Sequence, residues 1–126
     1  MARWQARSRR KFTGKKYRRA RKKRKSELER PSIDTTIGEK RIKRQRTMGG
    51  NEKLKLFSVS RINVTDPTTH ETKNVEILGF EENPASKDLN RRHILTKGTI
   101  VDTELGKVKI TSRPGQQAVL NGLLIE

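Results

Sequence analysis

The fold class of this chain is decided by residues 99–111, which read TIVDT-ELG-KVKIT. In the second half of this stretch Val108 and Ile110 alternate with polar residues, and a period of two is typical of a half-buried β-strand. The residues ELG at 104–106 separate this run from another β-branched run. The stretch therefore predicts an antiparallel hairpin.

The sequence around this hairpin continues as short strands separated by turns. We expect further strands at residues 54–64, 75–80 and 119–125. The alternation within residues 54–64 shifts phase near Leu56-Phe57, which predicts a β-bulge there.

Proline and glycine mark the predicted turns between these strands. Pro67 presets φ in the turn Asp66–His70, where histidine is among the residues enriched at positive φ. The strand at residues 75–80 is expected to end at residues 81–84. Pro114 and Gly115 occupy the positions that a type II turn requires.

These elements predict a mostly β fold, a small antiparallel β-barrel of about six short strands with an extended, basic N-terminal arm. No long helix is expected. Closure of the barrel would remove the exposed edge strands of so small a sheet. We assign residues 32–126 to the barrel domain and residues 1–31 to the arm, which ends at Arg30-Pro31 because proline disfavours helical geometry in the residue before it.

Charge is distributed very unevenly along the 126 residues. The whole chain has 31 Lys or Arg and 14 Asp or Glu, a net charge of +17, and residues 1–25 contain 14 of the basic residues and no acidic one. Residues 54–126, by contrast, contain 10 basic and 9 acidic residues. Because it combines like charges with few apolar residues, we expect the arm to be disordered when it is free.

A second basic segment follows the arm. Residues 40–46, KRIKRQR, are predicted to form a strand with a heavily basic exposed side. Gly49 and Gly50 tolerate positive φ and predict a chain reversal after it.

The two basic segments predict a nucleic-acid interface. Guanidinium and ammonium groups neutralise phosphates and release counterions, and aromatic rings between basic clusters stack on unpaired bases. The candidate RNA-binding residues are Arg3, Trp4, Arg7, Arg9, Arg10, Lys11, Phe12, Lys15, Lys16, Tyr17, Arg18, Arg19, Arg21, Lys22, Lys23, Arg24, Lys25, Lys40, Arg41, Lys43, Arg44, Arg46 and Arg113.

The charge taken alone is compatible with several kinds of protein. A basic run also suits a solvated face or an import signal, and a DNA-compacting or general nucleic-acid-binding protein would be equally basic. The three aromatic residues of the arm favour RNA over duplex DNA. Arg113, which lies in the predicted Pro-Gly turn, is either an RNA contact or a solvated loop residue.

The sequence contains no constellation typical of an enzyme. His70 and His93 are isolated, so neither belongs to a pair with metal-ligand spacing, and an enzyme acting on RNA would need a convergent polar set that is missing here. There is no cysteine, which removes disulfides and thiolate metal sites and suits a reducing compartment. No apolar run is long enough to span a bilayer. We therefore expect an intracellular, cytoplasmic protein with no cofactor, no metal, no small-molecule substrate and no membrane partner.

Several short blocks of sequence, taken together and in order, resemble those of a known protein family. The start WQARSRRK at residues 4–11 followed by Thr13-Gly14, and ARKKRK at residues 20–25, resemble the archaeal and eukaryotic (e-type) small-subunit ribosomal protein eight family. The blocks GEKR at 38–41, GGN at 49–51, NPA at 83–85, TKG at 96–98 and TSRPGQ at 111–116 continue the resemblance in order.

This resemblance implies a small β-barrel with an N-terminal extension that binds ribosomal RNA, and no enzymatic activity. It implies a structural constituent of the small ribosomal subunit, located in the ribosome, with small-subunit ribosomal RNA and neighbouring ribosomal proteins as partners. The compact length is similar to that of archaeal members, because eukaryotic members carry a long insertion.

Overall fold

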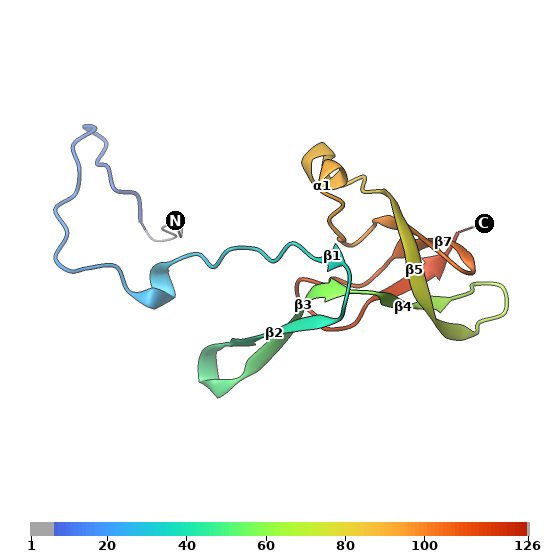
Figure 1. The fold of residues 1–126 in the computed structure, drawn as a ribbon. Coiled ribbons are helices and arrows are strands. Elements are labelled where there is room, and N and C mark those ends of the chain that lie inside the picture. Colours follow the sequence, from blue (N-terminus) through green and yellow to red (C-terminus); the bar gives the residue numbers. More distant parts are fainter. Residues whose placement is uncertain (1–6, 126) are drawn as a thin grey trace. The chain divides into compact units, whose positions relative to one another are not determined.

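The computed structural model describes residues 7–125. Arg3 and Trp4, two of the candidate RNA-binding residues, lie outside this range. The chain divides into two compact units, Met1–Ser32 and Ile33–Glu126. All the regular strands of the described residues belong to the second unit (Figure 1).

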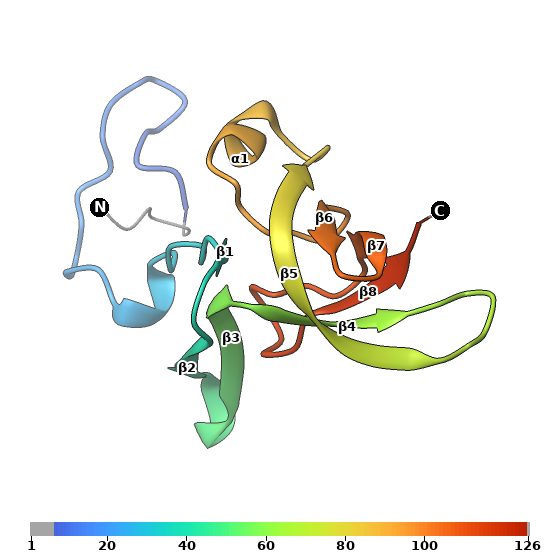
Figure 2. The same cartoon turned by 45° about the vertical axis from the view of Figure 1, so that its right-hand side comes forward.

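Five strands form a closed barrel. In barrel order they are β4 (Arg61–Thr65), β5 (Thr72–Glu82), β6 (Ile100–Thr103), β7 (Gly106–Ile110) and β8 (Asn121–Leu124). Neighbours from β4 to β8 pair antiparallel, and β8 closes the ring by pairing with β4 in parallel. The predicted small β-barrel is confirmed, with five barrel strands and one parallel pair. Figure 2 shows β5 running past both β4 and β6.

Alternating apolar side chains from these strands fill the barrel. The largest fully buried side chains inside it include Ile62, Val64, Val101, Val108 and Ile110. The hairpin predicted at residues 99–111 is confirmed: β6 pairs with β7, and Val101 lies opposite Val108 with both side chains buried. Burial of large apolar side chains contributes about 1.5–3 kcal/mol each, and it supplies the stability of this small domain.

A second, three-stranded sheet precedes the barrel in the chain. Its order is β1 (Thr36–Ile37), β3 (Glu52–Val59) and β2 (Arg41–Arg46), with β1 parallel and β2 antiparallel to β3. The 3₁₀ turn η2 (Met48–Gly50) joins β2 to β3 and contains two glycines at positive φ, which confirms the predicted reversal. Figure 1 shows the β2–β3 hairpin extending away from the barrel strands.

The strand predicted at residues 54–64 is divided in the structure. β3 and β4 belong to different sheets, and Ser60 lies between them. The predicted bulge is confirmed, because Arg41 pairs with Ser58 and the next residue pairs with Leu56, which leaves Phe57 unpaired. The division occurs because one end of the run completes a sheet and the other end joins the barrel.

A buried asparagine organises the long connection from β5 to β6. β5 runs to Glu82, beyond the predicted end of that strand, and the next residue, Asn83, is 3% exposed. Its Nδ2 donates to the Ile94 carbonyl oxygen at 2.7 Å, and its backbone N–H donates to Asn90 Oδ1 at 2.9 Å. These bonds hold the short helix α1 (Lys87–Arg91) in the loop.

Two of the predicted turns have different outcomes. His70 has φ of 58°, as expected for the turn Asp66–His70, and Asp66 Oδ1 accepts the Thr68 backbone N–H at 2.8 Å.

The chain also turns at Arg113, where Gln116 N donates to the Arg113 carbonyl oxygen at 2.9 Å. Gly115, however, is not at positive φ, so the predicted type II turn is wrong. The carbonyl of Arg113 instead accepts from two successive N–H groups, as in a helical turn.

Candidate nucleic-acid interface

The first unit contains a small loop whose basic side chains are exposed. Arg10 and Lys16 form an isolated antiparallel bridge, and Tyr17 N donates to the Arg9 carbonyl oxygen at 2.9 Å. Gly14 lies at the tip with φ of 79°, and its carbonyl oxygen accepts from Arg10 Nη1 at 2.7 Å. The loop has no apolar core of its own, so its cationic side chains remain in contact with solvent.

Tyr17 gathers cations within this loop. Its hydroxyl accepts a hydrogen bond from Arg7 Nη2 at 2.6 Å, and the Arg7 Cζ atom lies 4.4 Å from the ring centroid. Lys11 Nζ lies 5.6 Å from the same centroid. A hollow of about 240 Å³ opens beside the ring, and its lining includes Arg9 and Arg19. A phosphate in this hollow would face arginines on several sides, and arginine binds phosphate with paired N–H groups.

Phe12 is fully exposed near the tip of the same loop. An exposed ring makes no contribution to a core, whereas base–aromatic stacking stabilises a complex by about 1–3 kcal/mol per base. Its position between Lys11 and Gly14 therefore suits contact with an unpaired base.

The far end of the arm is organised by an ion pair. Arg21 Nη2 and Nη1 donate to the two carboxylate oxygens of Glu27 at 2.6 and 3.1 Å, and the backbone N–H of Arg24 donates to Glu27 Oε2 at 3.0 Å. These hydrogen bonds lower the pKa of Glu27 from 4.5 to about 2, with the bond from Arg21 as the largest cause. The pair lies at the 3₁₀ turn η1 (Lys25–Glu27).

The β2–β3 hairpin separates its cations onto two faces. Residues paired across an antiparallel ladder share a face, so Lys43 lies beside Lys55, and the pair Gln45 and Lys53 continues the row. Arg41 lies on the same side, with its Cζ atom 5.8 Å from the Phe57 ring centroid. We call Arg41, Lys43, Lys53 and Lys55 the hairpin face. None of the β2 or β3 residues on this side is acidic.

The opposite side of the hairpin carries the other two predicted arginines of β2. Arg44 lies there, and its Nε is 3.3 Å from Glu52 Oε2. Arg46 lies opposite Glu52 in the ladder. The predicted basic strand is confirmed, but its charges are divided between a purely cationic side and a side with an acidic partner.

Sequence reasoning missed Lys53 and Lys55. Their side chains join the hairpin face because β3 pairs with β2 in the observed register. The signal was present in the alternation Lys53-Leu54-Lys55-Leu56, which predicts one polar and one apolar side for the strand.

The turn at Arg113 lies against β3. Leu56 N donates to the Pro114 carbonyl oxygen at 2.9 Å, and Lys53 Nζ donates to Gln116 Oε1 at 3.4 Å. Arg113 itself is exposed. The structure thus brings this turn next to a strand that carries part of the hairpin face.

The other predicted cations of the first unit, together with Lys40, are exposed. In the first unit these are Lys15, Lys16, Arg18, Arg19, Lys22, Lys23, Arg24 and Lys25. Lys40 immediately precedes β2 and lines a separate hollow on the barrel side. Across residues 7–125 no three His, Cys, Asp or Glu side chains converge as metal ligands, and none of the helices there is long and apolar enough to cross a membrane.

Comparison with known proteins identifies the family. The family model described as ribosomal protein S8e matches residues 4–125. The chain belongs to the ribosomal protein S8e family. The resemblance inferred from the sequence blocks is therefore confirmed, and the match extends across both units.

Archaeal relatives share the S8e sequence over most or nearly all of their length. A protein of Nanoarchaeum equitans is 52% identical over 123 residues, covering 98% of this chain and 97% of the relative. One of Methanobrevibacter smithii is 52% identical over 103 residues, covering 82% of each chain. One of Sulfolobus acidocaldarius is 45% identical over 126 residues, covering 99% and 98%. All three are called small ribosomal subunit protein eS8.

Proposed function

We propose that this chain is a structural constituent of the small ribosomal subunit that binds ribosomal RNA. The similarity to small-subunit proteins along the whole chain carries the proposal. On this proposal its partners are small-subunit ribosomal RNA and neighbouring ribosomal proteins, its location is the cytoplasmic ribosome, and its role is structural and not enzymatic.

Two basic surfaces support RNA as the direct partner. Residues 3–25 of the arm combine dense cations with the exposed Phe12 and the cation-lined hollow beside Tyr17. The hairpin face adds a preformed row of cations. Phosphate neutralisation supplies affinity, and stacking favours segments with unpaired bases.

The arm contributes by ordering on the RNA. Alone, its like charges repel and it has no core of its own, so it is disordered when free; phosphates screen that repulsion. The barrel keeps its core without the arm, because every buried apolar side chain among the described residues belongs to Ile33–Glu126. The arm is thus an RNA-dependent extension of an independently folded domain.

Deletion of residues 2–25 tests this function. We expect the truncated chain to give the dispersed NMR spectrum of a folded barrel but to be left out of assembled small subunits. A full-length control with Arg18, Arg19, Lys22 and Lys23 changed to Gln should be incorporated to an intermediate extent. Normal incorporation of the truncated chain would contradict the proposal. Equal affinity of the intact chain for ribosomal RNA and duplex DNA at about 0.15 M salt would instead favour a general nucleic-acid-binding protein.

A further inference from the structure

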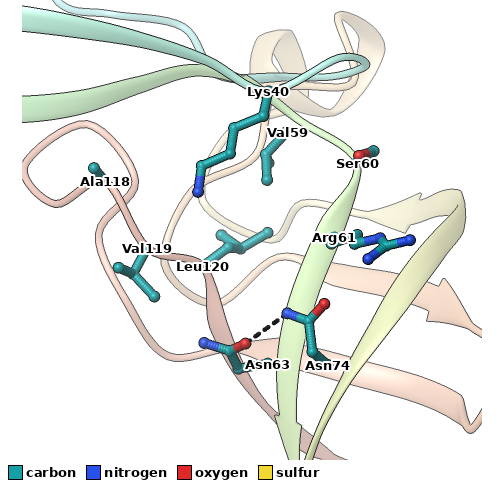
Figure 3. A pocket seen from close by; sticks show the side chains of 9 residues that line it. All are labelled: Lys40, Val59, Ser60, Arg61, Asn63, Asn74, Ala118, Val119 and Leu120. Carbon is teal, nitrogen blue, oxygen red and sulfur yellow. Dashed lines mark hydrogen bonds between the residues drawn. The ribbon is translucent and has the colours of Figure 1, made fainter.

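A hollow on the outside of the barrel combines amides, cations and apolar surface. It has a volume of about 230 Å³ and lies between Lys40, the strands β4 and β5, and the segment 118–120 (Figure 3). This is below the ~300 Å³ at which pockets for drug-sized ligands begin, so it suits a part of a larger molecule. No residue of the hairpin face lines it.

Three asparagines form a hydrogen-bonded row beside the hollow. Asn74 Nδ2 donates to Asn63 Oδ1 at 2.7 Å, and Asn63 Nδ2 donates to Asn121 Oδ1 at 2.9 Å. The row exists because Asn63 lies opposite Asn74 in the β4–β5 ladder and opposite Asn121 in the β4–β8 ladder.

Asn63 and Asn74 line the hollow, and Asn121 continues the row outside its lining. Within residues 7–125, the Asn74 Oδ1 acceptor and the Asn121 Nδ2 donor have no hydrogen-bond partner. Because each amide group has both a donor and an acceptor, a row of three leaves an unused hydrogen-bonding group at each end. Nucleobase edges present complementary donors and acceptors, and asparagine is a common reader of them.

Cations and apolar side chains complete the surroundings. Figure 3 shows Lys40 extending over the hollow toward Leu120, while Arg61 lies on the side near Asn74. Neither cation forms an ion pair among the residues that the structure describes. Val119 is 48% exposed at the wall and offers an apolar surface for one side of a ring.

We propose that this hollow binds one unpaired nucleotide of RNA, with the base against Val119 and the asparagine row and the phosphate between Lys40 and Arg61. The inference rests on the proposed function and adds to it a base-contacting site on the barrel. Duplex RNA does not fit, because its base edges are paired and its bases are stacked.

Side-chain amide NMR of the full chain tests the site. The probe is a single-stranded RNA hexanucleotide of mixed sequence, compared with the same hexanucleotide annealed to its complement. We expect the NH₂ signals of Asn63, Asn74 and Asn121 to shift with the single strand and not with the duplex. The NH₂ signal of Asn90, which lies in the β5–β6 connection, should stay in place as the internal control.

Variants give an independent measurement. Asn74→Ala and Arg61→Gln should each lower affinity for the single strand about 3- to 10-fold, as expected for one lost hydrogen bond or charge contact, with little change for the duplex. Lys109→Gln, which removes an exposed cation from β7, is the matched control and should leave both affinities unchanged. Arg61 has no ion-pair partner within the described residues, so its variant should fold even if Asn74→Ala does not.

The outcomes separate this site from the function on which it rests. If NMR signals of the arm shift on adding RNA while the three asparagine amide signals do not, the nucleotide site is overturned and RNA binding by the chain stands. No response anywhere in the chain would overturn both. Equal amide shifts with hexa-aspartate would also overturn the site, because the hollow would then select negative charge and not a base.

Discussion

Lys43 and Lys55 lie directly opposite each other in the β2–β3 ladder, so the structure places the two lysine side chains on the same face of the hairpin. Like charges in such a pair destabilise a sheet. The neighbouring pairs on this face add Lys53 and Arg41 and no acidic residue. An anion bound across the hairpin face would reduce the repulsion between these cations.

Lys55→Glu should therefore separate stability from binding. We expect the variant to unfold at higher urea concentration, with a gain of about 0.2–1 kcal/mol from the opposite-charge pair with Lys43. Its affinity for small-subunit ribosomal RNA should fall. Lys53→Glu, whose cross-strand partner is the neutral Gln45, is the control and should gain less stability. Equal stability changes in the two variants would count against repulsion between the paired lysines.

The two faces of the hairpin should respond differently to neutralisation. Lys43→Gln removes a cation from the acid-free face, whereas Arg44→Gln removes one that is 3.3 Å from Glu52. We expect Lys43→Gln to reduce the slope of log affinity against log salt by about 0.7–0.9, the range for one lost phosphate contact in single-stranded and duplex nucleic acid. Arg44→Gln should change the slope less. The reverse order, measured by fluorescence titration at several salt concentrations, would show that the other face binds RNA.

Phe12→Ala tests stacking by the arm. The ring is fully exposed, so its removal should not alter the free energy of unfolding. Affinity for single-stranded RNA should fall by about 1–3 kcal/mol, the usual contribution of one base–aromatic stack. Met48→Ala removes another exposed apolar side chain, at the hairpin turn, and serves as the control. Equal losses in both variants would indicate general apolar contact without stacking.

Gly122→Ala should damage the closure of the barrel. A Cβ atom at this position would lie 2.4 Å from Val108 Cγ1 and 3.0 Å from the Lys109 carbonyl oxygen. Overpacking of this kind costs about 1–3 kcal/mol, which urea unfolding would detect. At Gly79 the nearest heavy atom to such a Cβ is Asp102 Oδ2 at 3.7 Å, so Gly79→Ala is the permissive control. A Gly122→Ala variant as stable as the control would show that β8 can move away from β7.

The carboxylate of Glu27 should report on the order of the arm. Its pKa is about 2 when it accepts hydrogen bonds from Arg21 and Arg24, compared with 4.5 otherwise. Since the ordered state has the lower pKa, the stabilisation is complete above pH 4.5 and is lost as the pH falls toward 2. In the RNA complex at about pH 4, between these two pKa values, carbon-13 NMR should find Glu27 ionised.

Arg21→Gln provides the comparison for this titration. With the largest cause of the shift removed, Glu27 in the complex should titrate closer to 4.5. The free intact chain should also titrate near 4.5 if the arm is disordered without RNA. Identical midpoints for the intact and variant complexes would contradict the ion pair.

Local patterns predicted those parts of the fold that depend on neighbours in sequence. The hairpin at residues 99–111 follows from alternation around a turn, and the bulge at Phe57 follows from a phase shift within one strand. The break at Ser60 was not predicted, because apolar residues continue on both sides and only the competition between two sheets divides them. The type II turn failed for a similar reason: the backbone of residues 113–117 is set by hydrogen bonds of the turn and β3 that the Pro-Gly pair does not reveal.

By itself the sequence determined where the charge lies, that the carboxyl-terminal part forms strands, and which family the chain resembles, because composition, alternation and motif order are all local or additive properties. Only the tertiary structure decided which cations share a face and which amides touch. Lys43 meets Lys55, and Asn63 meets Asn74 and Asn121, through strand register, which arises from the way the apolar side chains of distant segments pack into one core.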